Sequence, residues 1–126
     1  MEGRCRCRLS LAHEYWNTVR TINVVESVPK TLVGRRIGDQ LFRSGTSVGA
    51  NFEEAPAAES KDDFVHSLQI ALKELRESNY WLRLLAEAGK LPKPCLEPLL
   101  DESNQLVAML SKAVAKVKGK AKPVAP

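Results

Sequence analysis

The segment from Phe64 to Leu85 repeats apolar side chains every three or four residues, the spacing that keeps them on one side of an α-helix. Ser60 precedes it as a suitable N-cap, Asp63 suits the positive end of the helix dipole, and Gly89 follows as a stop. The segment predicts a long helix with one apolar face, formed by Phe64, Leu68, Ala71, Leu75, Leu82 and Leu85.

A second helix is predicted from Thr31, a suitable N-cap, to about Ala55, just before Pro56. At about 100° per residue, four glycines fall on its apolar side, although each costs a helix about 1 kcal/mol relative to alanine. We expect close approach by a neighbouring helix to offset this cost. The alternative is that Gly45 breaks the helix in a turn. The four are Gly34, Gly38, Gly45 and Gly49.

Two further helices complete the pattern. The first is expected from about Leu9 to Val28, with Trp16 on its apolar stripe, and Pro29 stops it. The fourth is expected from about Pro98 to Val117, after an irregular turn through Pro94–Glu97, because two prolines fit poorly inside one helix. Four helices with short connections predict an all-α fold, an antiparallel up-down-up-down four-helix bundle.

A chain of 126 residues fits one domain. We expect a basic N-terminal extension over residues 1–8, the bundle over residues 9–118 and a disordered tail over residues 119–126. No segment approaches the ~20 apolar residues of a membrane span, and no signal peptide is recognisable. We therefore expect a cytoplasmic protein. The three cysteines lack the spacing of a zinc site and predict reduced thiols. They are Cys5, Cys7 and Cys95.

The positive charge lies at the two ends of the chain. The net charge is +4, of which residues 1–8 hold +2 and residues 112–126 hold +5, which leaves −3 for residues 9–111. Such ends are either solvated or attract nucleic acid in a salt-sensitive, sequence-independent way. The candidate phosphate contacts are Arg4, Arg6, Arg8, Lys112, Lys116, Lys118, Lys120 and Lys122.

Polar residues line one edge of the second predicted helix, and three residues of the third are candidates to meet them. Two interpretations are open: a carboxylate site for a metal or for acid–base chemistry, or a network that fixes helix register and subunit packing. The second is favoured, because buried charges are retained when they are paired. The set comprises Arg43, Ser47, Asn51 and Glu54 with Lys73, Glu74 and Glu77.

Other catalytic patterns are missing from the sequence. Metal sites in helix bundles use Glu-x-x-His pairs on facing helices, and the only near match, Asp63 to His66, has no counterpart. The segment Gly45–Gly49 lacks the lysine and the preceding strand of a phosphate loop. We therefore expect neither catalytic activity nor a metal or cofactor. Ile70, Trp81 and Leu84 lie away from the main apolar face and predict a subunit interface.

From Arg43 to Glu54, and on through Glu59-Ser60-Lys61 to Tyr80-Trp81-Leu82, the chain resembles the bacterial 23S rRNA intervening-sequence protein family. The resemblance extends from Pro29 to Leu85. It implies a cytosolic four-helix bundle that assembles as a homo-oligomer, a ring of five. It also implies distant kinship with the basic pentameric accessory proteins of diversity-generating retroelements, which bind nucleic acid and a reverse transcriptase.

Members of this family are described without an established biochemical function. We therefore expect a non-enzymatic scaffold or binding protein whose first partner is a second copy of itself, with no membrane contact. The alternative is an accessory protein that binds RNA, or a nucleic-acid-processing protein, through its basic ends. A small hydrolase or metal-dependent enzyme that uses Glu54, Glu74 or Glu77 is the third possibility.

Overall fold

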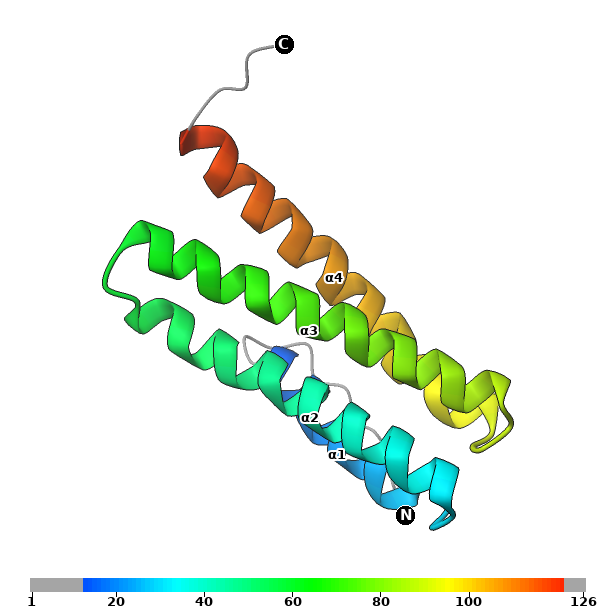
Figure 1. Ribbon diagram of the computed structural model, residues 1–126. Coiled ribbons are helices and arrows are strands. Elements are labelled where there is room, and N and C mark those ends of the chain that lie inside the picture. Colours follow the sequence, from blue (N-terminus) through cyan, green and yellow to red (C-terminus); the bar gives the residue numbers. More distant parts are fainter. Residues whose placement is uncertain (1–12, 122–126) are drawn as a thin grey trace.

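A computed structural model describes residues 13–121. Four α-helices follow one another, with a single 3₁₀ turn after the second (Figure 1). The described residues contain no strand, and the all-α prediction is confirmed. The elements are α1 (His13–Ser27), α2 (Leu32–Glu54), η1 (Ala55–Ala57), α3 (Lys61–Glu87) and α4 (Lys93–Ala121).

Each helix packs beside the next one in the chain, and α1 also packs against α4. Two buried apolar groups hold the helices together. One, around Leu75 and Leu106, draws on α2, η1, α3 and α4, but takes no residue from α1. The other, around Leu41, Leu82 and Leu96, includes Val28 just after α1. The predicted face of α3 is confirmed, because its leucines and Ala71 are buried and Phe64 packs against them.

The helix ends follow their predicted signals. Thr31 Oγ1 accepts a hydrogen bond from the Gly34 N–H at 3.1 Å, and Ser60 Oγ does the same for Asp63 at 3.1 Å. Gly89 has φ 69°, the left-handed conformation that glycine adopts without strain. It ends α3 together with a hydrogen bond from Lys90 N–H to the Leu85 carbonyl at 2.9 Å.

Two glycines of α2 allow α1 to pack closely against it, as predicted. A Cβ on Gly45 would lie 2.6 Å from Thr21 Cγ2, and a Cβ on Gly49 would lie 2.8 Å from Thr18 Oγ1. Thr18 Oγ1 also donates a hydrogen bond to the Gly45 carbonyl at 3.4 Å. α2 continues through Gly45, so the alternative of a turn at this position is wrong.

The other two glycines of α2 have different surroundings. A Cβ on Gly34 would lie 2.0 Å from the Pro29 carbonyl oxygen, so here the close group is the preceding turn and not the neighbouring helix. A Cβ on Gly38 would meet only Val25 Cγ1, at 3.9 Å, an ordinary contact. Of the four predicted glycines, two lie where an added Cβ would crowd threonine side chains of α1, one lies against a turn, and one has room for a methyl group.

The prediction of an irregular turn before the fourth helix is wrong. α4 begins at Lys93 and includes both Pro94 and Pro98. Pro94 lies in the first turn, where backbone N–H groups have no helical acceptor. Pro98 removes one hydrogen bond, the one that its N–H would donate to the carbonyl four residues earlier, which belongs to Pro94.

The ends of the described region also bear on the predictions. α4 continues to Ala121, so residues 119–121, expected to be disordered, are helical. α1 ends at Ser27, one residue before the predicted end. The predicted start at Leu9 lies outside the described residues. The same is true of Arg4, Cys5, Arg6, Cys7, Arg8 and Lys122.

Candidate functional site

The predicted polar edge includes an ion-pair group between α2 and α3. Arg43 Nη1 donates to Glu74 Oε1 at 3.1 Å, and Arg43 Nη2 pairs with Glu77 and donates to Gln40 Oε1 at 3.2 Å. The Arg43 side chain is 49% exposed and that of Glu74 is 16% exposed. Ion pairs this exposed contribute about 0–1 kcal/mol each. Each of these pairs therefore contributes little to the stability of the contact between α2 and α3.

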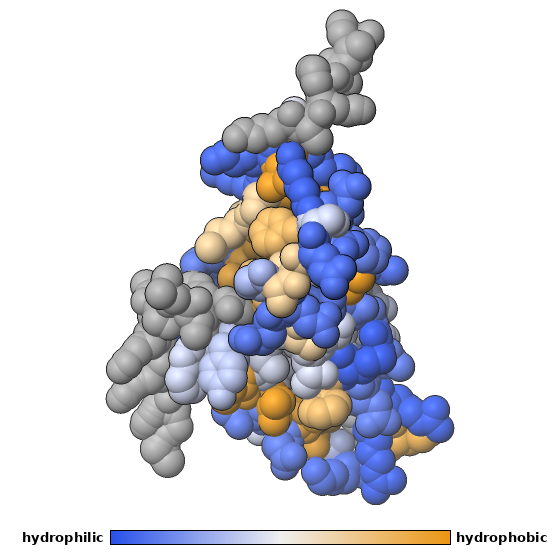
Figure 2. All heavy atoms as spheres, turned by 90° about the vertical axis from the view of Figure 1, so that its left-hand side faces the viewer, coloured by the Kyte–Doolittle hydropathy of each residue, from blue (hydrophilic) through white to orange (hydrophobic). Residues whose placement is uncertain are grey.

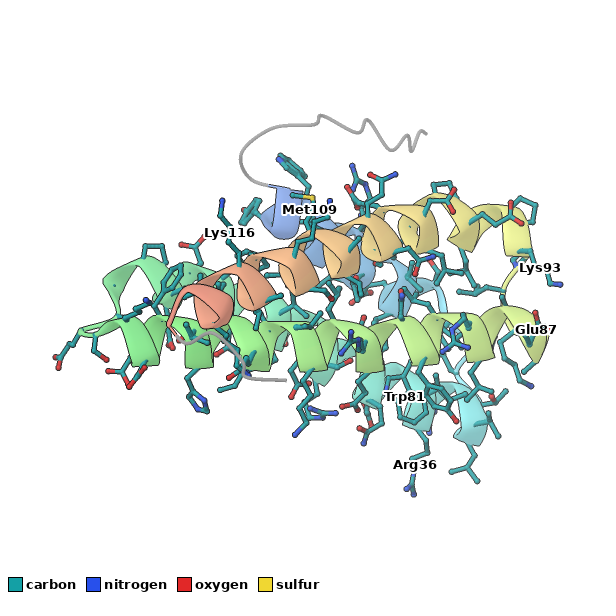
Figure 3. The ribbon with its side chains drawn as sticks, turned by 90° about the horizontal axis from the view of Figure 1, so that it is seen from above. Arg36, Trp81, Glu87, Lys93, Met109 and Lys116 are labelled. Atoms are coloured by element: carbon teal, nitrogen blue, oxygen red, sulfur yellow. The ribbon has the colours of Figure 1, made fainter. Side chains whose placement is uncertain are left out.

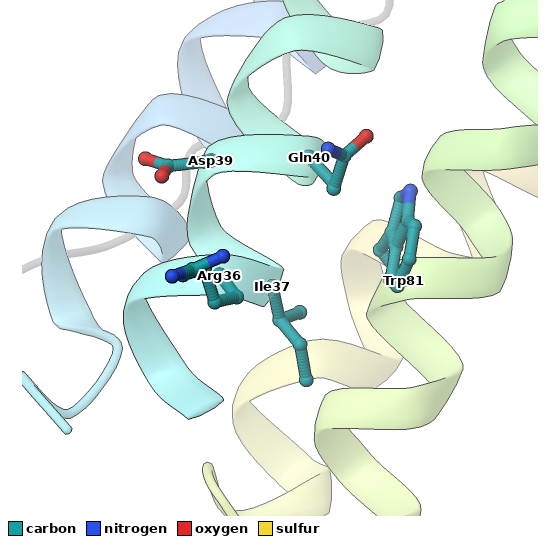
Figure 4. Close-up of a pocket in the computed structure, with 5 residues that line it drawn as sticks. All are labelled: Arg36, Ile37, Asp39, Gln40 and Trp81. Carbon is teal, nitrogen blue, oxygen red and sulfur yellow. The ribbon is translucent and has the colours of Figure 1, made fainter. Parts of the chain in front are cut away.

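Trp81 belongs to the same surface. Its indole Nε1 donates to Glu77 Oε2 at 3.1 Å, and its ring meets Tyr80 edge to face with centroids 4.9 Å apart. Figure 4 shows Trp81 on α3 facing Gln40 and Ile37 on α2. Together with Arg36 and Asp39 these residues line a hollow of about 360 Å³.

The remaining polar residues of the predicted set lie apart from this group. Asn51 Nδ2 donates to the Ser47 carbonyl at 2.9 Å and to Ser47 Oγ at 3.3 Å, a pair within α2. Glu54 and Lys73 are exposed and make no ion pair with another described residue. The seven residues therefore do not form one network, because only Arg43 bridges from α2 to α3.

The three residues predicted for a subunit interface are all half-buried within the protomer. Trp81 and Leu84 pack against the buried group around Leu82, while Ile70 belongs to neither buried group. Trp81 is thus a structural residue of the protomer as well as an interface candidate. The assignment of these residues to a contact between copies stays a prediction.

A buried polar cluster between α1 and α4 was not predicted from the sequence. Asn17 Nδ2 donates to Ser103 Oγ at 3.1 Å and to Glu102 Oε1 at 3.3 Å, and Arg20 pairs with the same carboxylate. Asn17, Glu102 and Ser103 are each less than a tenth exposed. The signal in the sequence was Ser103, which stands between Leu99 and Leu106 where the apolar repeat of α4 expects a core residue.

In the first turns of α1, polar side chains are buried and aromatic side chains are exposed, the reverse of an ordinary amphipathic helix. Asn17 and Thr21 are buried, whereas Tyr15 and Trp16 are 53% and 42% exposed. The prediction that Trp16 lies on the main apolar face is therefore wrong, because Asn17 occupies the inward position against α4. The exposed large apolar residues of the described chain are Tyr15, Trp16, Leu32, Val33, Phe42, Tyr80 and Met109.

The end of the molecule that carries the α2–α3 connection also shows apolar side chains among polar ones (Figure 2). Phe52, Phe64 and Val107 are half-buried and pack against the buried group around Leu75. These residues complete the protomer core. They are therefore weaker candidates for a binding surface than the exposed apolar residues named above.

Comparison with known protein families matches residues 11–112 to the model of the 23S rRNA-intervening sequence protein family. The chain belongs to this family. The match includes all of α1 and most of α4, and so extends beyond the segment from Pro29 to Leu85 on which the resemblance rested. No curated protein matches this intervening-sequence protein.

A solved structure similar to this intervening-sequence protein is described as a protein with unknown function from the S23 ribosomal protein family of Bacteroides thetaiotaomicron VPI-5482. The two chains are 33% identical, with a TM-score of 0.72. The alignment covers 82% of this chain and 95% of that chain. The relative therefore supports the fold over nearly its whole length and brings no assigned activity with it.

The described part of this family member holds no group of three or more His, Cys, Asp or Glu side chains placed to bind a metal ion. Asp63 and His66, the near match to a metal motif, line a hollow of about 530 Å³ with Lys61 and Lys118, between the start of α3 and the end of α4. Cys95 is an exposed free thiol. Within residues 13–121, no helix has the length and apolar character to cross a membrane.

Proposed function

We propose that this intervening-sequence protein is a non-enzymatic scaffold or binding protein that works as a homo-oligomer. The observation that carries the proposal is the exposure of large apolar side chains at the start of α2 and in the second half of α3. Leu32 is 68% exposed and Val33 48%. Tyr80 is 47% exposed and adjoins the interface candidate Trp81 in the sequence. Aromatic side chains in such a position are typical of the centre of protein interfaces.

We infer that the protomer is an antiparallel up-down-up-down bundle. The connection from α2 to α3 covers residues 55–60 and spans at most about 20 Å when extended. α2 has 23 residues and is about 35 Å long. A connection this short joins neighbouring ends, so the next helix runs back along the previous one. The ring of five subunits rests on the family resemblance alone.

The measurement that tests the scaffold is mass by light scattering. Five chains of 14.0 kDa give a mass of about 70 kDa. The double variant Val33→Ser with Tyr80→Ala should lower this mass while circular dichroism keeps its helical signal, because both side chains are exposed in the protomer.

Phe42→Ala is the matched control for this experiment. Phe42 is 48% exposed, but it follows Val33 by nine residues and lies half a turn round α2 at about 100° per residue. It should leave the mass unchanged. A monomeric wild-type chain would overturn the scaffold proposal, whereas a mass that falls only with Phe42→Ala would move the contact to the opposite face of α2.

RNA binding through the basic ends is the second candidate function, favoured by one observation. After Glu102 the sequence has five lysines and neither aspartate nor glutamate. Lys112, Lys116 and Lys118 are exposed on the second half of α4. Retention of RNA at low salt and its release as salt rises would support this function through counterion release. Absence of binding at low salt would remove it.

A further inference from the structure

We propose that the edge between the start of α1 and the second half of α4 is a binding site for single-stranded nucleic acid. In this site Tyr15 and Trp16 stack on bases, and Lys112 and Lys116 contact phosphates. The proposal rests on the second candidate function and names its site on the folded body, in place of the terminal segments alone.

The aromatic part of the site lies next to the buried polar cluster of Asn17, Glu102 and Ser103. Tyr15 and Trp16 lie in the first turn of α1, and their ring centroids are 5.5 Å apart with an angle of 86° between the planes. They meet edge to face, so the two rings are not stacked in parallel, and the edge of one ring lies against one face of the other. The next residue, Asn17, is buried and bonded to Glu102 and Ser103 of α4. This anchor presents both aromatic rings outward.

Met109 and two lysines continue the surface along α4. Met109 is 57% exposed, and Figure 3 shows it beside the start of α1, with Lys116 on the same side of α4. At about 100° per residue, Lys112 and Lys116 lie within about 60° of the direction of Met109 round the helix. Both lysines are exposed, and neither forms an ion pair with a residue in the described range. Their charge is therefore available to an anion.

The chemistry of this edge favours nucleic acid over a protein partner. Aromatic residues and methionine are enriched in protein interfaces, but lysine is depleted there. Proteins that bind single strands combine a basic track along the phosphates with aromatic rings on which successive bases stack. A single strand is favoured over a duplex because only unstacked bases offer their faces to an exposed ring.

The first experiment uses fluorescence of the full chain. The sequence has two tryptophans, so Trp81→Phe leaves Trp16 as the sole emitter. The probe is an oligouridylate of about 12 nucleotides, within the site sizes of single-strand binding folds. Stacking should quench Trp16 fluorescence on addition of the single strand, and the same strand paired with oligoadenylate should quench it far less.

The second experiment compares affinities by anisotropy of the labelled strand. Trp16→Ala should weaken binding by about 5- to 150-fold, the cost of losing one stacked base. Lys112→Ala with Lys116→Ala should reduce the slope of log affinity against log salt by about 0.7 for each phosphate that the variant no longer neutralises. Phe42→Ala and Lys73→Ala, exposed residues of α2 and α3, are the matched controls and should leave affinity within about twofold of the wild type.

The outcomes separate failure of the site from failure of the function. A wild-type chain that binds no strand at low salt overturns both. Binding that is unaffected by the Trp16 and lysine variants, but abolished when residues 1–8 and 122–126 are deleted, overturns the site and keeps the function. If Trp16→Ala changes the mass of the assembly and leaves RNA affinity intact, the edge is a contact between copies and the proposal is wrong.

Discussion

Gly38 and Gly45 look alike in the sequence but have opposite expected responses to alanine. At Gly38 a methyl group has room, so Gly38→Ala should stabilise the protein by up to about 1 kcal/mol through helix propensity. At Gly45 a methyl group would press on Thr21 Cγ2 at 2.6 Å. Overpacking of this kind costs about 1–3 kcal/mol and outweighs the same gain. Urea denaturation at one fixed protein concentration measures both differences.

Thr21→Ser provides the control for the Gly45 prediction. Thr21 is buried, and its hydroxyl donates to the Asn17 carbonyl at 2.9 Å, so rotation away from a new methyl group would break that hydrogen bond. Serine keeps the hydroxyl and removes Cγ2. Gly45→Ala should therefore be tolerated in the Thr21→Ser background. An equal loss of stability in both backgrounds would show that the contact with Thr21 is not the cause.

At the scale of the elements, the contact between α1 and α4 depends on the Glu102 carboxylate, which binds Arg20 and Asn17. Its side chain is 9% exposed and that of its ion-pair partner Arg20 is 14% exposed. Removing one member of a largely buried pair costs about 3 kcal/mol, because the other charge stays in a poorly solvated position. Glu102→Ala should therefore lower the free energy of unfolding by about this amount, and amide hydrogen exchange should accelerate first in α1.

The exposed pair between Glu87 and Lys93 is the matched control. The two atoms are 3.7 Å apart, and the side chains are 74% and 58% exposed. Glu87→Ala should cost no more than about 1 kcal/mol. Equal losses of unfolding free energy for Glu87→Ala and Glu102→Ala would contradict the interpretation that burial makes the Arg20–Glu102 pair the more stabilising one.

The sequence predicted the elements well where local rules decide. Thr31, Ser60 and Gly89 act through short-range hydrogen bonds and backbone conformation, and their roles are confirmed. The prolines wrongly predicted an irregular turn before α4. The helix continues through Pro98, because a proline there removes only the hydrogen bond to the Pro94 carbonyl. The core position of Asn17 was not predictable from periodicity, because its partners Glu102 and Ser103 are 85 and 86 residues away.

The same limit applies to the candidate site. Arg43 was correctly linked to Glu74 and Glu77, because spacing along two helices predicts which edges can meet. The outward orientation of Tyr15 and Trp16 was not predicted, because an apolar residue in a helical repeat normally faces the core. It follows from the tertiary packing of α1 against α4, where a polar residue takes the inward position.

At the scale of the whole molecule, assembly should make thermal stability depend on concentration. A partner that binds only the folded state stabilises it by mass action. For five identical subunits, a tenfold rise in concentration contributes four-fifths of RT ln 10, about 1.1 kcal/mol per chain. In a domain of this size that raises the unfolding midpoint by about 3–5 °C. Differential scanning calorimetry over two decades of concentration measures the slope.

The variant Val33→Ser with Tyr80→Ala tests whether the exposed apolar residues of α2 and α3 cause the dependence of the unfolding midpoint on concentration. Both residues are about half exposed in the protomer, so their replacement should leave the monomer's own stability nearly unchanged. The midpoint should then lose its dependence on concentration, while at the lowest concentration it should approach that of the wild type. A midpoint that ignores concentration in the wild type would contradict assembly. A slope preserved in the variant would place the contact on another face of the protomer.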